Sequence, residues 1–436
     1  MSTSSEQDPD DSLEPDVSPA AEAPQVQRAR AAMVRRLWEL EALRSERVAE
    51  VFATVDRHVF APGVPVEEVY DATTAVRTKW DEHGSAISSI SAPQIQAFML
   101  EQADVRPGMR VLEVGSGGVN AAMLAELVGD TGHVTTMDID PEITGRSRKL
   151  LDAAGYPQVH VECADAEHGV PARAPFDVVL VTVGCWDLPA ALTDQLAESG
   201  RIVVPLRMRG ITRSLSLHLA GDHLLADSAE VCGFVKAQGL GAHQERMLLL
   251  HGDRIALRFD DDTAPADPAR LDGALGTERA DVWSGITVKA MEPFDSLGLW
   301  LASVLPRSCR LAVDPDYDPA IDSGPVMVVP EGRWFPDAYV NSHEDSFAYL
   351  ATRRRDDGLF EFGAHAFGPH AGEAAEAMVE QIRAWDRDYR HGPDPSVVVW
   401  PYDAPDEALE SPDAAATTVI PKRHTTITIS WPHPSA

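Results

Sequence analysis

Three groups of residues stand at the ends of predicted strands, where they could bind a nucleotide-like ligand. The first is a glycine-rich segment, EVGSGG at residues 113–118, between a strand pattern over 111–114 and a helical pattern over 119–128. Because glycine has no side chain, such a loop lets backbone amides at a helix start approach a ligand closely. An ordinary tight turn has the same pattern, so the loop alone does not establish a site.

Two acidic residues extend this pattern. Asp138 ends the next predicted strand, where its carboxylate could accept hydrogen bonds from both hydroxyls of a ribose. Asp165 follows the third strand, where it could bond the amino group of an adenine. Either residue could instead form a turn, and Asp140 is the better candidate for capping the helix that Pro141 begins. The three signals in this order favour a nucleoside-binding site.

The elements that must position these residues alternate between strands and helices. This alternation predicts a Rossmann-like, doubly wound and mostly parallel α/β sheet. Two further strands, over residues 213–219 and 229–235, are expected at the far edge of this sheet. The sheet's other expected strands are residues 111–114, 133–138, 159–163, 176–183 and 201–206, and its helices are residues 119–128, 141–154 and 188–197.

Composition and turn signals divide the chain into four parts. Residues 1–27 are rich in Ser, Pro and acidic residues and contain no Lys or Arg, which predicts a disordered acidic tail. An α/β unit is expected over 28–245, beginning with a helical pair. A turn- and charge-rich linker over 246–270 then leads to a C-terminal α+β unit, residues 271–436. This C-terminal unit is expected to contain a hairpin around 356–358, a helix over 371–389 and strands over 397–400 and 424–431.

The composition also bears on partners and compartment. The formal net charge of −32 argues against a nucleic-acid partner, because phosphate binding needs basic clusters and none stands out for that purpose. The four cysteines show no metal-ligand spacing, so neither a structural zinc nor another metal site is expected. Without a signal peptide or an apolar membrane span in the sequence, the protein is expected to be cytoplasmic, with no membrane partner. The oligomeric state stays open.

A second motif, SSISAP at residues 88–93, gives the glycine loop a more specific context. Together the two segments resemble the protein-L-isoaspartate O-methyltransferases, and the resemblance covers roughly residues 30–210. It implies that residues 28–245 form a methyltransferase domain whose cofactor is S-adenosyl-L-methionine (SAM). The resemblance and the strand-end pattern together assign the cofactor to Glu113, Gly115, Ser116, Gly117, Asp138 and Asp165.

The resemblance also implies a substrate side. Ser91 corresponds to the serine that lies between the SAM methyl group and the peptide carboxylate, and is the expected catalytic residue. The alternative for Ser91 is a helix N-cap ahead of Pro93. A carboxylate is already anionic at neutral pH, so an in-line displacement at the methyl group needs no strong general base. The residues expected to bind substrate are His83, Gly84, Ser89, Ile90 and Trp186.

Several positions depart from the family pattern. Val119 replaces the third glycine of the loop, alanines flank Asp165, and Gln94 replaces a histidine. The bulky Trp186 lies in a shortened segment where small residues are usual. The cofactor features persist while the acceptor side is altered, which predicts a changed substrate.

A variant branch fits these departures better. The loop GSGG with Asn120 and the long C-terminal extension resemble the methyltransferases encoded with lanthipeptide systems, especially the FxLD system. That resemblance implies a peptide partner, a macrocyclic modified ribosomal precursor, in which methylation of an aspartate leads to aspartimide and isoaspartate. The C-terminal unit would then recognise the substrate, with Arg353–Arg355 either contacting an acidic peptide or forming a solvated turn.

Two other functions stay open. The first is general repair of isoaspartate in damaged proteins. The second is a non-catalytic adaptor with the same fold, for which Val119 is the only indication.

Overall fold

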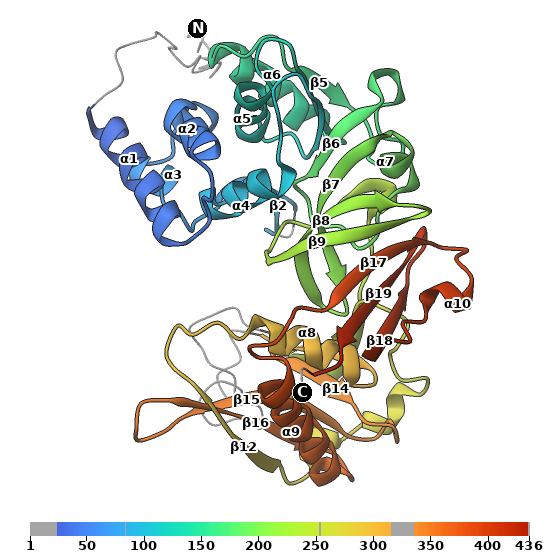
Figure 1. Cartoon of the computed structure of the whole chain (residues 1–436). Coiled ribbons are helices and arrows are strands. Elements are labelled where there is room, and N and C mark those ends of the chain that lie inside the picture. Colours follow the sequence, from blue (N-terminus) through green and yellow to red (C-terminus); the bar gives the residue numbers. More distant parts are fainter. Residues whose placement is uncertain (1–23, 83, 253, 315–334, 435–436) are drawn as a thin grey trace, which may run out of the picture.

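The computed structural model describes residues 24–82, 84–252, 254–314 and 335–434 (Figure 1). Most of the expected acidic tail therefore lies outside the described residues, as does His83. Residues 24–27, also assigned to that tail, instead form the first turn of helix α1 (Pro24–Glu39). Val26 in this turn is buried, so packing holds the start of the helix.

A ten-stranded sheet runs through the molecule, and its strand order is β18-β19-β17-β9-β8-β7-β6-β3-β4-β5. The strands from β7 to β5 are parallel, which confirms the predicted Rossmann-like core. The parallel strands are β3 (Arg110–Val114), β4 (His133–Asp138), β5 (His160–Cys163), β6 (Phe176–Val181) and β7 (Leu196–Met208). The antiparallel strands are β8 (Ile211–Ala220), β9 (His223–Val231), β17 (Ser396–Pro401), β18 (Ala414–Pro421) and β19 (Thr425–Pro432).

Strands β8 and β9 lie inside this sheet, and the expectation that they form its far edge is wrong. The outer edge of β9 pairs with β17 through Leu224 opposite Val399 and Leu225 opposite Val398. An unpaired strand edge leaves backbone groups unsatisfied, and β17 covers this edge at the start of β9. The C-terminal part of the chain thus completes the sheet of the first unit.

The faces of the sheet pack against different clusters. In β6, Val178 and Leu180 belong to one cluster and Val179 and Val181 to the other. This alternation is expected of a parallel strand buried on both faces. The cluster that contains Val178 and Leu180 also includes residues of the helices α1, α2 (Glu46–Thr54), α4 (Pro93–Ala103), α5 (Val119–Val128) and α6 (Pro141–Ala153). The shorter elements of the first unit are η1 (Arg57–Phe60), α3 (Val66–Val69), β1 (Val76–Trp80), β2 (Ala86–Ile90), η2 (Pro171–Arg173) and α7 (Ala190–Asp194).

A second, antiparallel sheet of seven strands forms most of the C-terminal unit, in the order β10-β11-β13-β14-β15-β16-β12. Two helices, α8 (Asp295–Val304) and α9 (Ala371–Asp388), accompany it, which confirms the α+β character. Its strands are β10 (Arg246–His251), β11 (Ile255–Phe259), β12 (Ala280–Val288), β13 (Ser308–Val313), β14 (Asp337–Val340), β15 (Phe347–Arg354) and β16 (Phe360–Phe367). Short helical turns are η3 (Gly239–Gly241), η4 (Pro268–Leu271), η5 (Ala274–Gly276) and α10 (Asp406–Leu409).

Residues 246–270, expected to be a linker, contain β10 and β11 of this second sheet. The side chains of Ile255, Leu257 and Phe259 lie at alternate positions of β11 in one hydrophobic cluster, and Ala256 between them is also buried. The turn-rich composition of residues 260–268 describes only the end of this segment. The predicted hairpin around residues 356–358 is confirmed as the β15–β16 pair.

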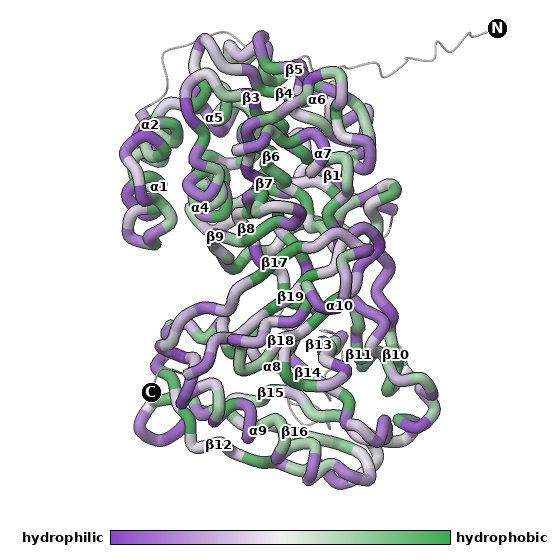
Figure 2. Tube along the Cα trace, turned by 45° about the vertical axis from the view of Figure 1, so that its right-hand side comes forward, coloured by the Kyte–Doolittle hydropathy of each residue, from purple (hydrophilic) through white to green (hydrophobic). Residues whose placement is uncertain are grey.

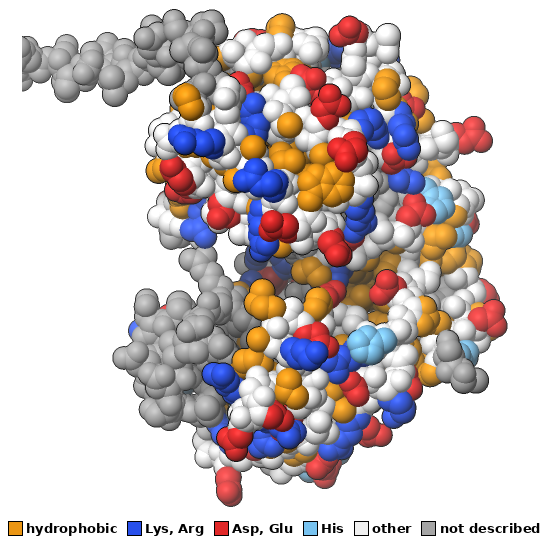
Figure 3. Space-filling view, turned by 60° about the vertical axis from the view of Figure 1, so that its left-hand side comes forward, with side chains coloured by type: hydrophobic (Ala, Val, Ile, Leu, Met, Phe, Trp, Pro, Cys, Tyr) orange, Lys and Arg blue, Asp and Glu red, His pale blue; other side chains and the backbone are white. Residues whose placement is uncertain are grey.

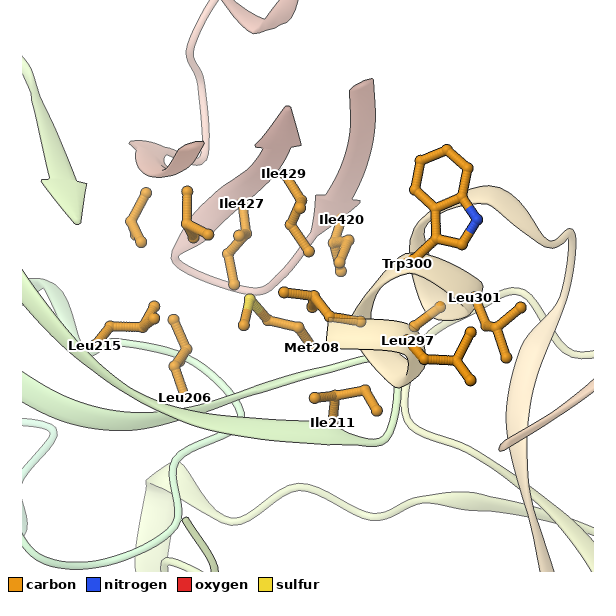
Figure 4. Packing of buried hydrophobic residues seen from close by; sticks show 14 of the residues in the cluster. Leu206, Met208, Ile211, Leu215, Leu297, Trp300, Leu301, Ile420, Ile427 and Ile429 are labelled. Atoms are coloured by element: carbon orange, nitrogen blue, oxygen red, sulfur yellow. The ribbon is translucent and has the colours of Figure 1, made fainter. Parts of the chain in front are cut away.

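The two units share one hydrophobic cluster (Figure 4). Leu206 and Met208 from β7 lie in it with Leu297 from α8 and Ile427 and Ile429 from β19. Figure 2 shows hydrophobic strands continuing from β6 and β7 through β17 and β19. The space-filling view shows the surface hollowed between the upper and lower parts of the molecule (Figure 3). None of the helices within the described ranges has the length and apolar character needed to cross a bilayer.

Candidate active site

Two neighbouring cavities lie at the carboxyl ends of β3, β4, β5 and β6. The first is lined by the glycine loop and β2, and the second by the loop after β5 and residues 236–238. Four lining residues are common to both, namely Ile87, Gly115, Asp138 and Val183. The cavities therefore form one elongated site, at the edge where open α/β sheets bind their ligands.

The glycines of the loop differ in why they are needed. A Cβ on Gly115 would lie 2.5 Å from Thr182 Oγ1, and one on Gly118 would lie 2.7 Å from Phe60 Cδ1. Both also have positive φ angles, of 103° and 85°, so the fold itself requires glycine there. A Cβ on Gly117 would meet nothing nearer than the Ser89 carbonyl oxygen, at 3.8 Å. Gly117 lines the first cavity, so its bare backbone is available to a ligand.

Ser116 lies within this loop and is held by two hydrogen bonds. Its side chain is buried and its Oγ donates to Ser147 Oγ at 3.0 Å. Its amide donates to Asp138 Oδ2 at 3.1 Å. Ser116 also lines the first cavity, where its hydroxyl and amide fix the loop and Asp138.

Asp138 and Asp140 have the different surroundings that the sequence predicts. Asp138 lines both cavities and accepts hydrogen bonds from the amides of Ser116 and Asp140. Burial raises the pKa of the Asp138 carboxyl above its usual value. Asp140 caps α6 by accepting from the Glu142 amide, and its carboxylate lies 2.6 Å from Lys79 Nζ. Asp140 is thus confirmed as the helix cap.

Glu113 lines the first cavity from the end of β3. Its side chain is buried and accepts a hydrogen bond of 2.6 Å from Thr136 Oγ1. Burial raises the pKa of the Glu113 carboxyl to about 8. A cationic group bound in this cavity would favour the ionised form of both Glu113 and Asp138.

Asp165 lines the second cavity, but its carboxylate already has partners. Oδ1 accepts from the Glu167 amide and Oδ2 from the Leu240 amide, each at 2.9 Å. A Cβ on Gly239 would lie 2.4 Å from Asp165 Oδ2, so the chain closes tightly over this group. The hydrogen bond to an adenine amino group that the sequence predicts would use a remaining lone pair of this carboxylate.

The predicted substrate segment forms β2, which pairs with β1 in a small antiparallel sheet. Ser89, Ile90 and Ser91 line the first cavity together with the glycine loop. Ser91 is not the N-cap of α4, because that position belongs to Ala92, which makes no side-chain cap. Gly84 lies in the β1–β2 turn and lines neither cavity.

A buried arginine that the sequence analysis did not identify as a site residue supports this segment. Arg57 is fully buried and donates to the carbonyl oxygens of Ser91, at 2.5 Å, and Val69, at 2.8 Å. It also bonds Gln96, whose amide nitrogen donates to Asn120 Oδ1 at 2.9 Å. Burial lowers the pKa of Arg57 to about 9. The sequence signal for Arg57 was its place in the motif RHVF at residues 57–60. A buried arginine needs hydrogen-bond acceptors such as these carbonyl oxygens.

Trp186, predicted to bind substrate, lines neither cavity. Its indole stacks on His243, with ring centroids 3.8 Å apart, and Nε1 donates to the Asp260 carbonyl oxygen at 2.5 Å. Its bulk is therefore used in a contact with later parts of the chain. Sequence reasoning missed this contact because His243 and Asp260 are remote in sequence.

Comparisons with known proteins agree with this geometry. Residues 28–238 match the family model described as Protein-L-isoaspartate(D-aspartate) O-methyltransferase (PCMT). The Protein-L-isoaspartate O-methyltransferase of Methanopyrus kandleri is 41% identical over 181 residues, covering 41% of this chain and 77% of the relative. That of Hyperthermus butylicus is 38% identical over 187 residues, covering 41% of this chain and 75% of the relative.

Two solved structures are also similar. A protein-L-isoaspartate O-methyltransferase is 18% identical with a TM-score of 0.46, covering 85% of this chain and 96% of that one. A putative enzyme of the same name from Plasmodium falciparum, in complex with S-adenosyl-L-homocysteine, is 17% identical with a TM-score of 0.42, covering 48% and 98%. The sequence relatives and the family model decide the assignment: the chain belongs to the protein-L-isoaspartate O-methyltransferase family and is a SAM-dependent protein carboxyl O-methyltransferase.

Proposed function

We propose that this enzyme methylates an aspartate or isoaspartate carboxylate in a ribosomally made, modified peptide, and that the ester leads to aspartimide and isoaspartate. The observation that carries the proposal is the C-terminal unit, which lies outside the family match and yet shares the core of the catalytic unit. The cofactor cavities keep the family's elements, so this added unit needs another purpose. Recognition of a particular peptide is the purpose we assign to residues 271–436.

The fit of the cofactor to the site rests on three features. The backbone of Gly117 is uncovered in the first cavity, which Glu113 and Gly115 also line. The methionine end of SAM would lie there. The buried carboxylate of Glu113 and the partly buried carboxylate of Asp138 complement a cationic ligand, and Asp138 lines both cavities where the ribose would lie. Asp165 marks the adenine end. SAM, when bound, supplies an activated methyl group.

Ser91 is the proposed catalytic residue. It lies in the same cavity as Glu113 and Gly117, and Arg57 fixes its carbonyl. Its hydroxyl would hold one oxygen of the substrate carboxylate so that the other faces the methyl group. Ser89 and Ile90, in the same cavity, would bind the peptide around that carboxylate, and alignment and exclusion of water would supply most of the rate. The ester is then open to attack by the next backbone nitrogen, which gives the five-membered imide and releases methanol.

The Arg353–Arg355 cluster gives little support to the recognition of an acidic peptide. Arg353 makes two hydrogen bonds to the buried Glu361, and its guanidinium lies 4.2 Å from the ring centroid of Trp283. Arg355 lies 3.3 Å from Asp357. Two of the three charges are therefore paired within the hairpin, which favours the solvated turn. The hollow between the two parts of the molecule is a better candidate surface (Figure 3).

General repair of isoaspartate is the second candidate, because the relatives in sequence carry that enzyme's name. The adaptor hypothesis is not retained, because the chain belongs to a family of enzymes. Val119 does not disrupt the loop, since it is buried as the first residue of α5.

The test compares two substrates with the full chain. A ribosomal precursor peptide encoded beside this gene, with its rings installed, is incubated with enzyme and SAM, alongside a short linear isoaspartyl peptide. We expect mass spectrometry to show one added methyl group on the ringed peptide, followed by loss of methanol, and much slower reaction of the linear peptide. A kcat/KM as high for the linear peptide would assign the enzyme to repair.

A further inference from the structure

A segment between β9 and β10, residues 232–245, crosses the second cavity, and we call it the strap. Lys236, Ala237 and Gln238 line this cavity. The strap is attached to Gly184, which donates to the Val235 carbonyl at 2.8 Å and accepts from the Ala237 amide at 3.0 Å. Its Leu240 amide binds the Asp165 carboxylate. The strap therefore closes the end of the site where Asp165 lies.

The far end of the strap is fixed by charge and by ring stacking. Glu245 accepts from Lys236 Nζ at 3.0 Å and Arg258 Nε at 3.1 Å, and also pairs with Arg207. These cations hold the pKa of the Glu245 carboxyl at about 2, against the effect of burial. The strap also places His243 on the indole of Trp186.

Residues 422–425, which are the turn between β18 and β19 with the first residue of β19, meet the same region from the C-terminal end of the chain, and we call them the C-terminal turn. Lys422 is buried, and its Nζ donates to the Arg207 carbonyl at 2.8 Å. The same Nζ lies 4.4 Å from the centroid of the Trp186 ring, which is the geometry of a cation–π contact. Lys422 and His243 thus contact one indole from two remote segments.

The C-terminal turn also binds the loops that follow β5 and β6. The His424 amide and Thr425 Oγ1 donate to the two oxygens of Asp187, each at 2.6 Å. Arg423 Nη2 and His424 Nε2 lie 3.0 Å and 2.6 Å from the carboxylate of Glu167. Because the Glu167 amide binds Asp165, the turn is two contacts away from the proposed adenine contact.

We propose that the C-terminal turn is a positioning device of the cofactor site, which holds the strap and the loop after β5 so that the adenine end of SAM is retained. Lys422, Arg423 and His424 are the positioning residues. None of them lies within the family match, which ends at residue 238. The inference rests on the cofactor cavities and not on the peptide substrate, so either proposal can fail alone.

The test measures how fast S-adenosyl-L-homocysteine, the product form of the cofactor, dissociates from full-length variants. Arg423→Ala removes the contact with Glu167 from a half-exposed side chain, whereas Arg423→Lys keeps the charge. Lys422→Met removes the ammonium above Trp186. Lys289→Met changes an exposed lysine of the same C-terminal unit and is the matched control.

For Lys422→Met and Arg423→Ala we expect S-adenosyl-L-homocysteine to dissociate about tenfold faster, a change of about 1.4 kcal/mol. Arg423→Lys should restore slow dissociation, and Lys289→Met should leave it unchanged. The thermal unfolding of the ligand-free protein should change little in Arg423→Ala, which separates positioning from loss of folding. Should Arg423→Ala and a folded Lys422→Met both release the ligand at the wild-type rate, the proposal is wrong. Should they bind it normally and lose only peptide methylation, the turn acts on the substrate instead.

Discussion

Asp138 and Asp140 lie two residues apart and differ in what surrounds them. Asp138 lines both cavities, whereas Asp140 is paired with Lys79 and caps a helix. We predict that Asp138→Ala weakens SAM binding tenfold or more, since a lost charge-assisted hydrogen bond costs on the order of 1.5–3 kcal/mol. Asp140→Ala should keep the affinity and lose about 1 kcal/mol of stability with the cap. Calorimetric titration compares the two, and equal affinities would contradict the assignment of Asp138.

Ser91 differs from these carboxylates because its proposed partner is the substrate. It shares the first cavity with the glycine loop, and a cap on α4 does not require its hydroxyl. For Ser91→Ala we predict nearly unchanged SAM binding and methyl transfer slowed about tenfold or more, because the carboxylate loses its alignment. Single-turnover methylation measures the rate, and calorimetry with SAM is the control. Wild-type turnover would remove Ser91 from catalysis.

We predict that cofactor binding is linked to the release of a proton from Glu113. Burial raises the pKa of its carboxyl to about 8, so it is mostly protonated in the free enzyme at pH 7. The ammonium and sulfonium of SAM favour the ionised form and lower this pKa in the complex. Binding should therefore release a proton, and the affinity should rise with pH up to about 8.

Calorimetry in buffers of different ionisation enthalpy counts that proton. Glu113→Gln should remove this release. An affinity that does not change between pH 6 and about 8 would mean that Glu113 is not near the cationic groups of the cofactor.

At the scale of elements, the loop between β3 and α5 combines a requirement of the fold with one of the ligand. In Gly118→Ala the alanine would have to adopt a positive φ, and its methyl group would clash with the Phe60 ring. We therefore predict a loss of about 1–3 kcal/mol of unfolding free energy. Gly117→Ala meets no such contact and should leave stability nearly unchanged while weakening SAM binding. Chemical denaturation and calorimetric titration of both variants test this contrast. Normal SAM binding by Gly117→Ala would show that the ligand does not approach this backbone.

The sequence predicted those elements that are determined by residues close together in the chain. The glycine loop, the cap at Asp140 and the hairpin of β15 and β16 all follow from neighbouring residues. The pairing of β9 with β17 could not be predicted, because it joins strands far apart in the chain and leaves no periodic signal. The same holds for the strap over Asp165 and for Trp186, whose partners come from later segments. The helix expected at 188–197 is also shorter, since Leu196 already pairs with Phe176.

For the whole molecule, these remote pairings mean that the catalytic unit is completed by the end of the chain. Strand β17 pairs with the edge of β9 at Leu224 and Leu225, and β19 extends the sheet beyond β17. The residues at the contact between β7, α8 and β19 are buried and belong to one cluster (Figure 4). Removing the C-terminal unit would expose this apolar face and a strand edge to water.

This shared core predicts that the two units unfold together. Ile429 is buried in β19 within the cluster that contains Leu206 and Met208 of β7. Ile429→Ala should cost about 2–5 kcal/mol of unfolding free energy, as deletion of a buried aliphatic side chain does, and the loss should appear in one transition for the whole chain. Val419→Ala, at a position of β18 with an exposed side chain, is the matched control and should cost much less. Calorimetry measures the transition, and a fluorescent SAM analogue reports the first unit. Two separate transitions, with only the later part of the chain destabilised by Ile429→Ala, would show that the catalytic unit folds alone and that β17 and β19 merely rest on it.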